Sequence, residues 1–590
     1  MPMDKRWEVK AEGNQRKVER IASSQHIAPV LANLLVQRGI DTVEKARKFF
    51  NPSLGDLHNP FLMKDMDAAV RRVEEAVERG ERIMVYGDYD VDGTTAVALV
   101  YKFLRQIGHK DLLFYIPDRY IEGYGISHRG VDYAASKGVK LVIALDCGIK
   151  AVEKVDYAKE KGVDFIICDH HLPAEEIPRA VAVLDPKRTD CTYPFDELSG
   201  CGVGFKLVQA YAERHSIPFA EIEHLLDLLV VSIASDIVPL VDENRILAHY
   251  GLQHLNASPS RGLQSIIEIC RLDHQNITID DIVFKIGPRI NAAGRMRVDE
   301  NDQNALPSGG YAAVKLLVEG DEEMAKKIGR EIDGFNTDRK SIDRNVTQEA
   351  HDYIESHPEL KQRKSTVIYN PKWMKGIVGI VASRLIETYY RPTVVLTMSN
   401  GFVTGSARSI PGFDLYQAVE SCSDLLENFG GHMYAAGLTM RPENVEAFTQ
   451  RFNDFVEANI DPDILVPQVE IDLALDFADI TKSFHNDLNR FQPFGPGNAS
   501  PVFVTYAAIN AGEPRDVKLV GPEREHLRMD LTQASNPNVS IQTIAFQQPS
   551  HFEWIRGGKP IDICYQIVEN HYRGSVTTQL RIKDIKRNLK

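Results

Sequence analysis

The stretch RIMVYGDYDVDG, residues 82–93, decides the fold of this chain. Its apolar run at residues 83–86 is typical of a buried β-strand, and residues 94–104 have the pattern of a helix. Between these segments stand three carboxylates spaced two residues apart: Asp88, Asp90 and Asp92. Such side chains share one face only where the backbone is extended, and crowded carboxylates raise one another's pKa unless a cation offsets their charge. The stretch therefore predicts a strand, a cation-binding acidic turn and a helix.

Two other interpretations of the acidic turn remain open. The spacing D-x-D-x-D-G matches the first half of an EF-hand calcium loop, but apolar residues occupy positions 97–100, where the bidentate Glu of such a loop is expected. A solvated acidic turn without any ion is the other alternative.

Composition limits the class of protein. At 590 residues, with 43% hydrophobic and 26% charged residues, the chain is long enough for roughly three or four globular domains. Its seven dispersed cysteines form no CxxC pair, which favours free thiols in a reducing compartment. The net charge of −14 gives no general attraction to nucleic acid, so such a partner would need a local basic groove. Because neither an apolar signal core nor a long apolar span is evident, we expect a cytoplasmic protein with no membrane partner.

Strand-like and helix-like segments alternate after the acidic turn. Strand patterns occur at residues 112–116, 141–145, 165–168 and 181–184, and helix patterns at 94–107, 127–137 and 149–161. Repeated β-α-β units predict an α/β domain with a mainly parallel sheet covered by helices. In such sheets ligands bind beyond the carboxyl ends of the strands.

Further acids and imidazoles follow the predicted strands at this edge. Asp146 follows the strand at 141–145, Asp169-His170-His171 follow the strand at 165–168, and Asp236 ends a helix-like run at 225–235. Each aspartate taken alone is more often a helix cap or a turn residue, and a single histidine is more often packed than liganding. Together they indicate a site for manganese or magnesium rather than zinc, because the ligands are oxygen and imidazole without thiolate.

The remainder of the chain predicts further domains. We expect an N-terminal extension at 1–50 with a helix over 27–38, the parallel-sheet domain at 51–260, and a connecting helical region at 261–355 that ends in a long charged helix from 322. An α/β pattern restarts at 356–460 as a smaller domain. Short strands separated by turns at 461–590 predict an all-β barrel of OB type, a fold that binds single strands with basic and aromatic faces.

Ordered motifs carry a family resemblance. The segments VYGDYDVDGTTA, ALDCG, DHH and SIASDIVPL resemble the four motifs of the DHH phosphoesterase superfamily. Beyond them, GPRINAAGR at 287–295, GIVGIVASR at 376–384 and FGGH at 429–432 are similar to segments of the RecJ family of single-stranded-DNA-specific exonucleases. The resemblance covers most of the chain and implies a DHH domain, a DHH-associated domain joined to it by the long helix, and the C-terminal barrel.

The resemblance also implies a site with two divalent ions, manganese preferred and magnesium possible. Asp88 and Asp90 would serve one ion, and Asp92, His170 and Asp236 the other. Asp146 would bridge both ions, so that Asp146, His170 and His171 form the catalytic set, with His171 close to the substrate phosphate. Two ions roughly 4 Å apart can lower the pKa of a water and neutralise the transferred phosphate.

Substrate contacts are expected from both halves of the chain. The glycines and proline of GPRINAAGR predict a loop, on which Arg289, Asn291 and Arg295 offer two guanidinium groups and an amide for phosphate oxygens. Arg295 could instead pair with a nearby acid. The resemblance adds Arg119, and it implies Ser406 and Arg408 at a 5′ phosphate and His432 near the scissile bond. Many relatives have Trp-His where this chain has Trp373-Met374-Lys375, so this chain departs from the pattern at that histidine, and Lys375 could supply some charge.

The implied function is a 5′→3′ exonuclease on single-stranded DNA that releases 5′ mononucleotides in recombination and repair. Single-strand-binding protein and a RecQ-type helicase are its implied partners. Two alternatives remain. The smaller DHH enzymes hydrolyse short oligoribonucleotides, cyclic dinucleotides or pyrophosphate but lack the C-terminal barrel. A strand-binding scaffold with an inactive site is disfavoured by the full set of acids and histidines.

Overall fold

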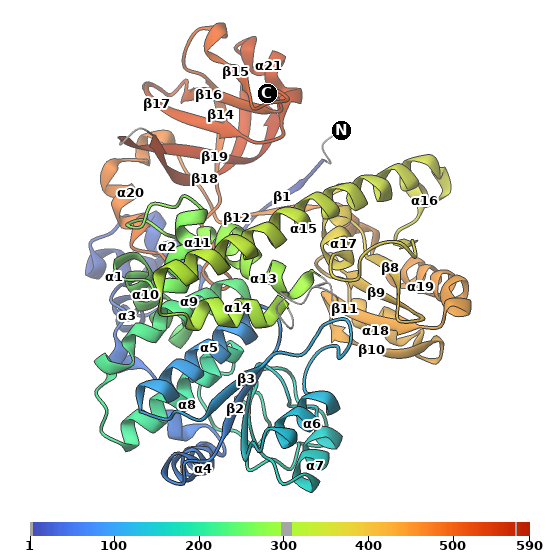
Figure 1. Ribbon diagram of the computed structural model, residues 1–590. Coiled ribbons are helices and arrows are strands. Elements are labelled where there is room, and N and C mark those ends of the chain that lie inside the picture. Colours follow the sequence, from blue (N-terminus) through green and yellow to red (C-terminus); the bar gives the residue numbers. More distant parts are fainter. Residues whose placement is uncertain (1–3, 297–308, 573–574, 590) are drawn as a thin grey trace. The chain divides into compact units, whose positions relative to one another are not determined.

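A computed structural model of the chain describes residues 4–296, 309–572 and 575–589 (Figure 1). The chain forms two compact units, one of Ser53–Ile460 and one that combines Met1–Pro52 with Asp461–Lys590. Each unit has its own hydrophobic core, and each is described separately below.

The larger unit begins with a five-stranded sheet in which every strand pair is parallel. Its order is β3-β2-β4-β5-β6, with bounds β2 Ile83–Gly87, β3 Leu112–Tyr115, β4 Leu141–Leu145, β5 Asp164–Cys168 and β6 Ala182–Leu184. From β2 the chain moves to one edge for β3 and then returns past β2 for β4, so the strand order reverses between β2 and β4. The carboxyl ends of β2 and β4 therefore flank the topological switch point where doubly wound sheets bind ligands.

Alternate residues of these strands pack against helices on opposite faces of the sheet. Val85 and Ile143 belong to the core shared with α4 (Met66–Glu78), α5 (Val91–Gln106), α8 (Gly200–Arg214) and α9 (Leu226–Ser235). Tyr86 and Ala144 face the other side and pack with α6 (His128–Ser136) and α7 (Val152–Glu160). Because both faces are covered, the strands are apolar throughout, which explains why their short runs could be recognised in the sequence.

Helices connect this domain to a second, smaller sheet. They are α10 Asp242–Ala257, α11 Arg261–Ile269, α12 Ile279–Asp281, a π-helical turn Ile282–Ile286, α13 Gly287–Arg295, α14 Gly309–Val318 and the 35-residue α15 Glu322–Ser356. The second sheet has the order β10-β11-β9-β8-β7, in which only β7 and β8 are parallel. Its strands are β7 Thr366–Tyr369, β8 Thr393–Ser399, β9 Phe402–Arg408, β10 Leu426–His432 and β11 Ala435–Met440, and its helices are α17 Val378–Tyr389, α18 Leu415–Glu420 and α19 Val445–Asn459.

The smaller unit is built around a closed, mostly antiparallel sheet. Its order is β13-β14-β18-β19-β17-β16-β15, and β14 also pairs with β16, which closes the sheet into a barrel. The strands are β13 Leu473–Ala474, β14 Phe503–Asn510, β15 Lys518–Val520, β16 His526–Gln533, β17 Asn536–Ala545, β18 Ile561–Tyr572 and β19 Ser575–Arg587. The α/β architecture with a long helix and a C-terminal all-β domain is thus confirmed.

The first 52 residues share a core with the barrel unit. Strand β1 (Arg6–Val9) pairs in parallel with β12 (Gln468–Ile471), and three helices follow: α1 Gln15–Gln25, α2 Pro29–Gln37 and α3 Val43–Phe50. Phe49 and Phe50 both pack edge-on against Phe491, and Trp7 Nε1 donates to Asp584 Oδ2 at 2.7 Å. The sequence predicted only the helix that became α2, because α1 buries just Val18 and Ile21 and its apolar pattern is weak.

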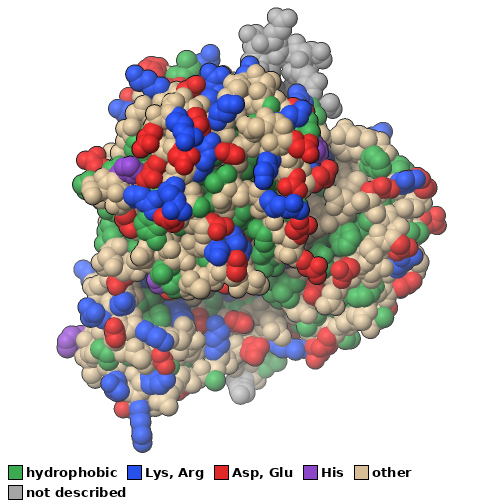
Figure 2. Space-filling model, turned by 90° about the horizontal axis from the view of Figure 1, so that it is seen from below, with side chains coloured by type: hydrophobic (Ala, Val, Ile, Leu, Met, Phe, Trp, Pro, Cys, Tyr) green, Lys and Arg blue, Asp and Glu red, His purple; other side chains and the backbone are tan. Residues whose placement is uncertain are grey.

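The surface carries both signs of charge. Figure 2 shows one face of the molecule on which acidic and basic side chains are interspersed, so the net charge of −14 is not matched by a single-signed surface on that face. Among the helices described, none is long and apolar enough to cross a membrane.

Candidate metal centre

The acidic turn after β2 is not extended along its whole length, and the expectation that it would be is wrong. Asp90 is the N-cap of α5 and accepts a hydrogen bond from the Gly93 N–H at 3.0 Å, while Asp92 already lies in the first helical turn. The helix starts here because an aspartate at the N-cap satisfies an exposed backbone donor. A strand end followed directly by a helix start therefore brings the three carboxylates together.

Asp92 is held from the far side by α8 and α9. Its Oδ1 accepts from the Cys201 N–H at 2.8 Å and from the Ser232 hydroxyl at 2.7 Å, and its Oδ2 accepts from the Gly200 N–H at 2.7 Å. Ser199 Oγ lies 2.7 Å from Ser232 Oγ and continues this network. A carboxylate offers about four acceptor sites. Three donors fix Asp92, and Oδ2 keeps one lone pair for a ligand on the open side.

Asp146 stands directly after β4 in a left-handed backbone conformation with φ of 59°. Few residues other than glycine adopt this region, and Asp is among those that tolerate it best. A Cβ at Gly200 would lie 2.6 Å from Asp146 Cβ, so only glycine allows α8 to start this close to the aspartate. Gly200 thus both donates to Asp92 and makes room for Asp146.

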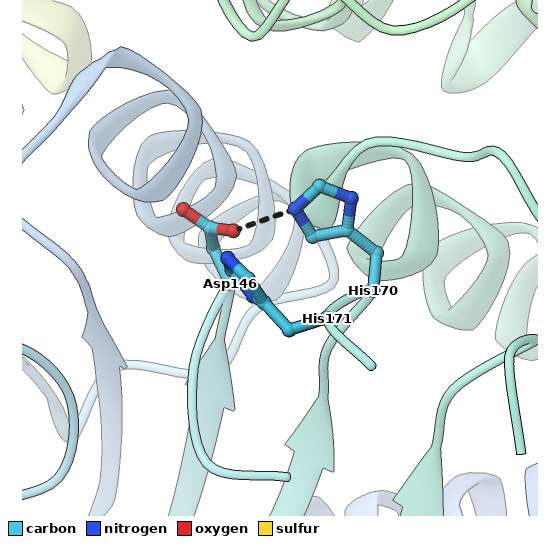
Figure 3. A group of neighbouring side chains, drawn as sticks. All are labelled: Asp146, His170 and His171. Atoms are coloured by element: carbon cyan, nitrogen blue, oxygen red, sulfur yellow. Dashed lines mark ion pairs between the residues drawn. The ribbon is translucent and has the colours of Figure 1, made fainter. Parts of the chain in front are cut away.

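His170 is the meeting point of four ligand-type side chains, of which Figure 3 draws His170 and Asp146, together with His171. Its Nδ1 lies 3.0 Å from the Leu198 carbonyl oxygen, which can only accept, so Nδ1 carries the proton and Nε2 presents a lone pair. Nε2 lies 3.2 Å from Asp146 Oδ1, 3.6 Å from Asp236 Oδ2 and 3.8 Å from Asp92 Oδ2. This is the arrangement of a metal-binding imidazole oriented by a backbone carbonyl.

His171 points to the same side but is held by a different carboxylate. Its Nδ1 lies 2.7 Å from Asp169 Oδ1, and Asp169 Oδ2 accepts from the Ile149 N–H at 2.9 Å. Burial favours the neutral form of Asp169, but the hydrogen bond and charge of His171 outweigh it and lower the pKa of Asp169 to about 2. Asp169 is therefore an orienting group for His171.

The centre contains more negative charge than its histidines can offset. Burial, followed by the charge of neighbouring aspartates, raises the pKa of Asp88, Asp146 and Asp236 well above the usual range. Asp88 is 1% exposed, and its Oδ1 has no hydrogen-bond partner within the described part of the chain. Buried carboxylates of this kind are satisfied by cations. The donor set of oxygens and imidazole fits hard divalent ions such as Mn²⁺ and Mg²⁺.

Three guanidinium groups gather beside this acidic centre. Arg119 stacks over the Tyr89 ring at 3.9 Å and donates from Nε to the Gly294 carbonyl at 3.0 Å. Burial and the positive charges of Arg119 and Arg408 lower the pKa of Arg295 to about 9. As far as the structure describes the chain, no carboxylate forms an ion pair with any of the three, so the alternative of a pairing acid for Arg295 finds no support there. Like charges held together without acids are typical of an anion site.

Arg408 and Ser406 lie at the start of α17. Arg408 Nη1 donates to Ser406 Oγ at 2.8 Å, and a Cβ at Gly379 would lie 2.9 Å from Arg408 Nη2 and 3.0 Å from Ser406 Oγ. Gly379 therefore lets both side chains approach the N-terminal turn of a 12-residue helix, where backbone N–H groups favour anions. His432 ends strand β10. Burial and the positive charges of Arg408 and His171 lower its pKa.

GPRINAAGR is a helix, α13, and the expectation of a loop is wrong. Pro288 is tolerated in the first turn, and Gly294 allows α13 to touch the acidic turn, since a Cβ there would lie 2.3 Å from the Tyr89 carbonyl oxygen. Asn291 Oδ1 accepts from the Val91 N–H at 3.1 Å and so supports the turn. Arg289 instead pairs with Asp333 of α15 at 2.8 Å and is not brought into the cluster.

Some supporting residues were missed from the sequence. Ser232 is a polar residue in an otherwise apolar helix, and a buried hydroxyl there needs a partner, which is a signal that could have been used. Ser199-Gly200-Cys201 carries a helix-start signal, a serine N-cap, but nothing in the sequence shows that this helix start faces Asp92. Lys375 Nζ donates to the Arg119 carbonyl at 3.3 Å and joins the cationic group.

Comparison with known protein families defines the class of the chain. Residues 82–233 match the DHH family N-terminal domain, residues 363–458 the DHHA1 domain and residues 471–584 the RecJ OB domain. The chain is thus a DHH protein in which the metal centre, the DHHA1 domain and an OB domain occur together.

Individual relatives are similar over nearly the whole chain. The single-stranded-DNA-specific exonuclease RecJ of Bacillus subtilis (strain 168) is 36% identical over 98% of this chain and 70% of its own length. That of Escherichia coli (strain K12) is 30% identical over 97% of this chain and 98% of its own. The crystal structure of RecJ with Mn²⁺ from Thermus thermophilus superposes with a TM-score of 0.82 at 25% identity, covering 99% of this chain and 80% of that one. The chain therefore belongs to the RecJ family of single-stranded-DNA-specific exonucleases.

Proposed function

We propose that this chain is a divalent-metal-dependent 5′→3′ exonuclease that degrades single-stranded DNA to 5′ mononucleotides during DNA recombination and repair. The observation that carries the proposal is the position of the acidic centre. Carboxylates and imidazoles converge at the switch point of the sheet, beside arginines that lack acidic partners in the described structure. A phosphodiester needs both features, cations at the reacting phosphate and positive charge for neighbouring phosphates.

The metal assignment is the one that the family resemblance implies, and the contacts among Asp92, Asp146, His170 and Asp236 support the part that these residues form. Asp88 and Asp90 would hold one ion, Asp92, His170 and Asp236 the other, and Asp146 would bridge them, with manganese preferred and magnesium as an alternative. When bound, the ions supply Lewis-acid chemistry that activates water and offsets phosphate charge. His171, oriented by Asp169, would donate a hydrogen bond to an oxygen of the scissile phosphate.

In the proposed reaction the bond between phosphorus and the 3′ oxygen of the terminal nucleotide breaks, and the oxygen of a water forms a new bond to phosphorus. The released nucleotide keeps its own 5′ phosphate, and the shortened strand carries a new one. Ser406, Arg408 and the start of α17 would bind the 5′-terminal phosphate and thereby set the polarity, while Arg119 and Arg295 would contact the next phosphates.

The family resemblance implies a cellular setting for this activity. We place the protein in the cytoplasm, acting on strands exposed by a RecQ-type helicase and covered by single-strand-binding protein. The barrel of residues 461–590 would bind the single strand.

A time course with manganese and single-stranded DNA labelled at its 3′ end tests the proposal. We expect a ladder that shortens from the 5′ end, and no ladder from a 5′-blocked strand. Arg408→Ala should erase the preference for a 5′ phosphate over a 5′ hydroxyl while leaving cleavage of the hydroxyl substrate nearly unchanged. Hydrolysis of dinucleotides alone, with long strands untouched, would overturn the assignment.

A further inference from the structure

The surface loop between β3 and α6 is held by several side-chain hydrogen bonds, both within the loop and to the end of β3. Asp118 Oδ1 accepts from the N–H groups of Tyr120 at 2.7 Å and Ile121 at 2.9 Å. Glu122 accepts from the Asp118 N–H at 2.9 Å and from the Tyr115 hydroxyl at 2.9 Å. These bonds hold the loop in one conformation.

Tyr124 lies in this loop. It stands between Gly123 and Gly125, whose φ angles of 83° and 86° are left-handed and favour glycine. The buried hydroxyl of Tyr86 donates to the Gly125 carbonyl at 2.9 Å and anchors the end of this segment to the sheet. The two glycines and the bond from Tyr86 therefore fix the backbone on both sides of Tyr124.

The Tyr124 hydroxyl reaches the metal centre. It donates to the backbone carbonyl of Asp146 at 3.0 Å, and since a carbonyl only accepts, the direction of this bond is settled. The same oxygen lies 3.3 Å from Nδ1 and 3.4 Å from Nε2 of His171, and the two rings meet edge to face at 5.7 Å. Asp169 Oδ1 and the Tyr124 hydroxyl therefore both contact the His171 ring.

We propose that Tyr124 is a positioning residue that keeps Asp146 in its left-handed backbone conformation and His171 in its orientation. Asp146 has φ of 59°, which an unsupported aspartate adopts only in a minority of conformers. A bond to its carbonyl fixes the peptide plane and so directs the carboxylate toward Nε2 of His170, 3.2 Å away. This role rests on the proposed function for its effect on turnover, but its effect on metal binding does not.

The test uses Tyr124→Phe, which removes one hydroxyl and keeps the ring. In this variant, half of the maximal thermal shift should be reached at a Mn²⁺ concentration about 10-fold higher than in wild type. Losses of this size are typical when a residue that orients metal ligands is removed. In the exonuclease assay we expect a lower kcat with an unchanged KM for single-stranded DNA. Tyr157→Phe is the matched control, because Tyr157 of α7 donates to Asp132 of α6 at 2.7 Å, and neither residue belongs to the metal centre. It should match wild type in every measurement.

The remaining outcomes separate the Tyr124 proposal from its alternatives. An unchanged Mn²⁺ half-saturation in Tyr124→Phe overturns it, as does an equal change in Tyr157→Phe. A raised KM with normal Mn²⁺ binding would make Tyr124 a substrate contact instead. If Tyr124→Phe melts earlier without metal, calorimetric Mn²⁺ titration at a temperature where both proteins are folded replaces the thermal shift, with the same criterion. If the wild type binds Mn²⁺ but leaves DNA intact, the proposed function fails while the Mn²⁺ comparison still judges Tyr124.

Discussion

Helix α8 contributes to two buried groups of charged side chains, and their charges are compensated in different ways. At its start, Gly200 and Cys201 donate to Asp92 of the metal centre. Six residues after Gly200, Lys206 pairs with Glu243 of α10 at 2.9 Å, and both side chains are fully buried. Burying a charge costs several kcal/mol unless partners compensate it, so each group must find compensation.

The Lys206–Glu243 group is complete in itself. Lys206 also donates to the His58 carbonyl at 2.8 Å, and Glu243 accepts from the His58 N–H at 2.8 Å and from the Tyr193 hydroxyl. Its charges cancel and its atoms have partners. A network of this kind stabilises one arrangement of α8, α10 and the preceding loop, and it has nothing left with which to bind a ligand.

The metal centre is incomplete by the same criteria. Carboxylates predominate in it, and Asp88 Oδ1 is unpartnered among the residues described. The comparison teaches that burial of charge does not by itself mark a functional site. The functional site is the one whose charge and hydrogen bonding remain unbalanced until a ligand arrives.

Asp146→Asn should produce the largest effect, because it removes one charge and retains the shape and the tolerance for a left-handed backbone. We expect exonuclease activity to fall by about 1,000-fold or more, since metal catalysis supplies several kcal/mol. Without metal, the variant should melt at a higher temperature than wild type because like-charge repulsion is relieved. Circular dichroism melting with EDTA and with Mn²⁺ checks both points. A lower melting temperature in EDTA would contradict the unbalanced-charge interpretation.

Glu243→Ala should have the next largest effect, on stability alone. Leaving Lys206 buried without its partner should lower the free energy of unfolding by about 3–5 kcal/mol. The double variant Lys206→Met with Glu243→Leu should be more stable than Glu243→Ala, because it leaves no unpaired charge. Urea denaturation of the wild type and each variant measures this. If Glu243→Ala costs no more than the double variant, the pair is not the closed network described here.

Asp185, directly after β6, shows a third way to bury a carboxyl group. Burial raises its pKa to about 7, although the Lys187 N–H donates to Oδ1 at 2.8 Å. The unfolded chain has the lower pKa, near 3.9, so the folded state binds more protons and stability falls as pH rises from about 4 to about 7.

Asp185→Asn should remove this pH dependence. The variant should have a higher free energy of unfolding than wild type, and this difference should be about 2 kcal/mol larger at pH 8 than at pH 5. Urea denaturation at both pH values measures it. Asp190→Asn serves as the control, because the pairing of Asp190 with Arg188 lowers its pKa and leaves it ionised throughout this range. An equal effect of Asp185→Asn at both pH values would show that Asp185 is ionised in the fold.

Ser232→Ala should have the smallest effect. It removes the hydroxyl that donates to Asp92 and should weaken Mn²⁺ binding by about 10-fold, with a small change in stability. Ser265→Ala is the matched control, a buried serine of α11 that donates to the Ala325 carbonyl at 3.1 Å. Calorimetric titration with Mn²⁺ compares the two, and equal affinities would show that Asp92 needs no support from α9.

Much of the fold was available from local patterns. The parallel sheet, its helices, the long α15 and the strands of the barrel follow from apolar runs and turn residues, which depend on neighbours in sequence. The aspartates and histidines of the centre were found because parallel strands place their carboxyl ends at one edge, so strand position alone brings such residues together. The unit shared by the two ends of the chain was not found, because the contact of Phe49 with Phe491 leaves no local signal.

The sequence by itself determined which residues could bind metal and at which edge of the sheet they lie, because alternating strands and helices have a fixed geometry. Only the tertiary structure decided how they are held. Asp92 depends on Gly200 and Ser232, and Asp146 on Tyr124, all distant in sequence. The pairing of Arg289 with Asp333 likewise depends on the tertiary structure. Hydrogen bonds and close packing between elements depend on distances in space, which the order of residues along the chain does not specify.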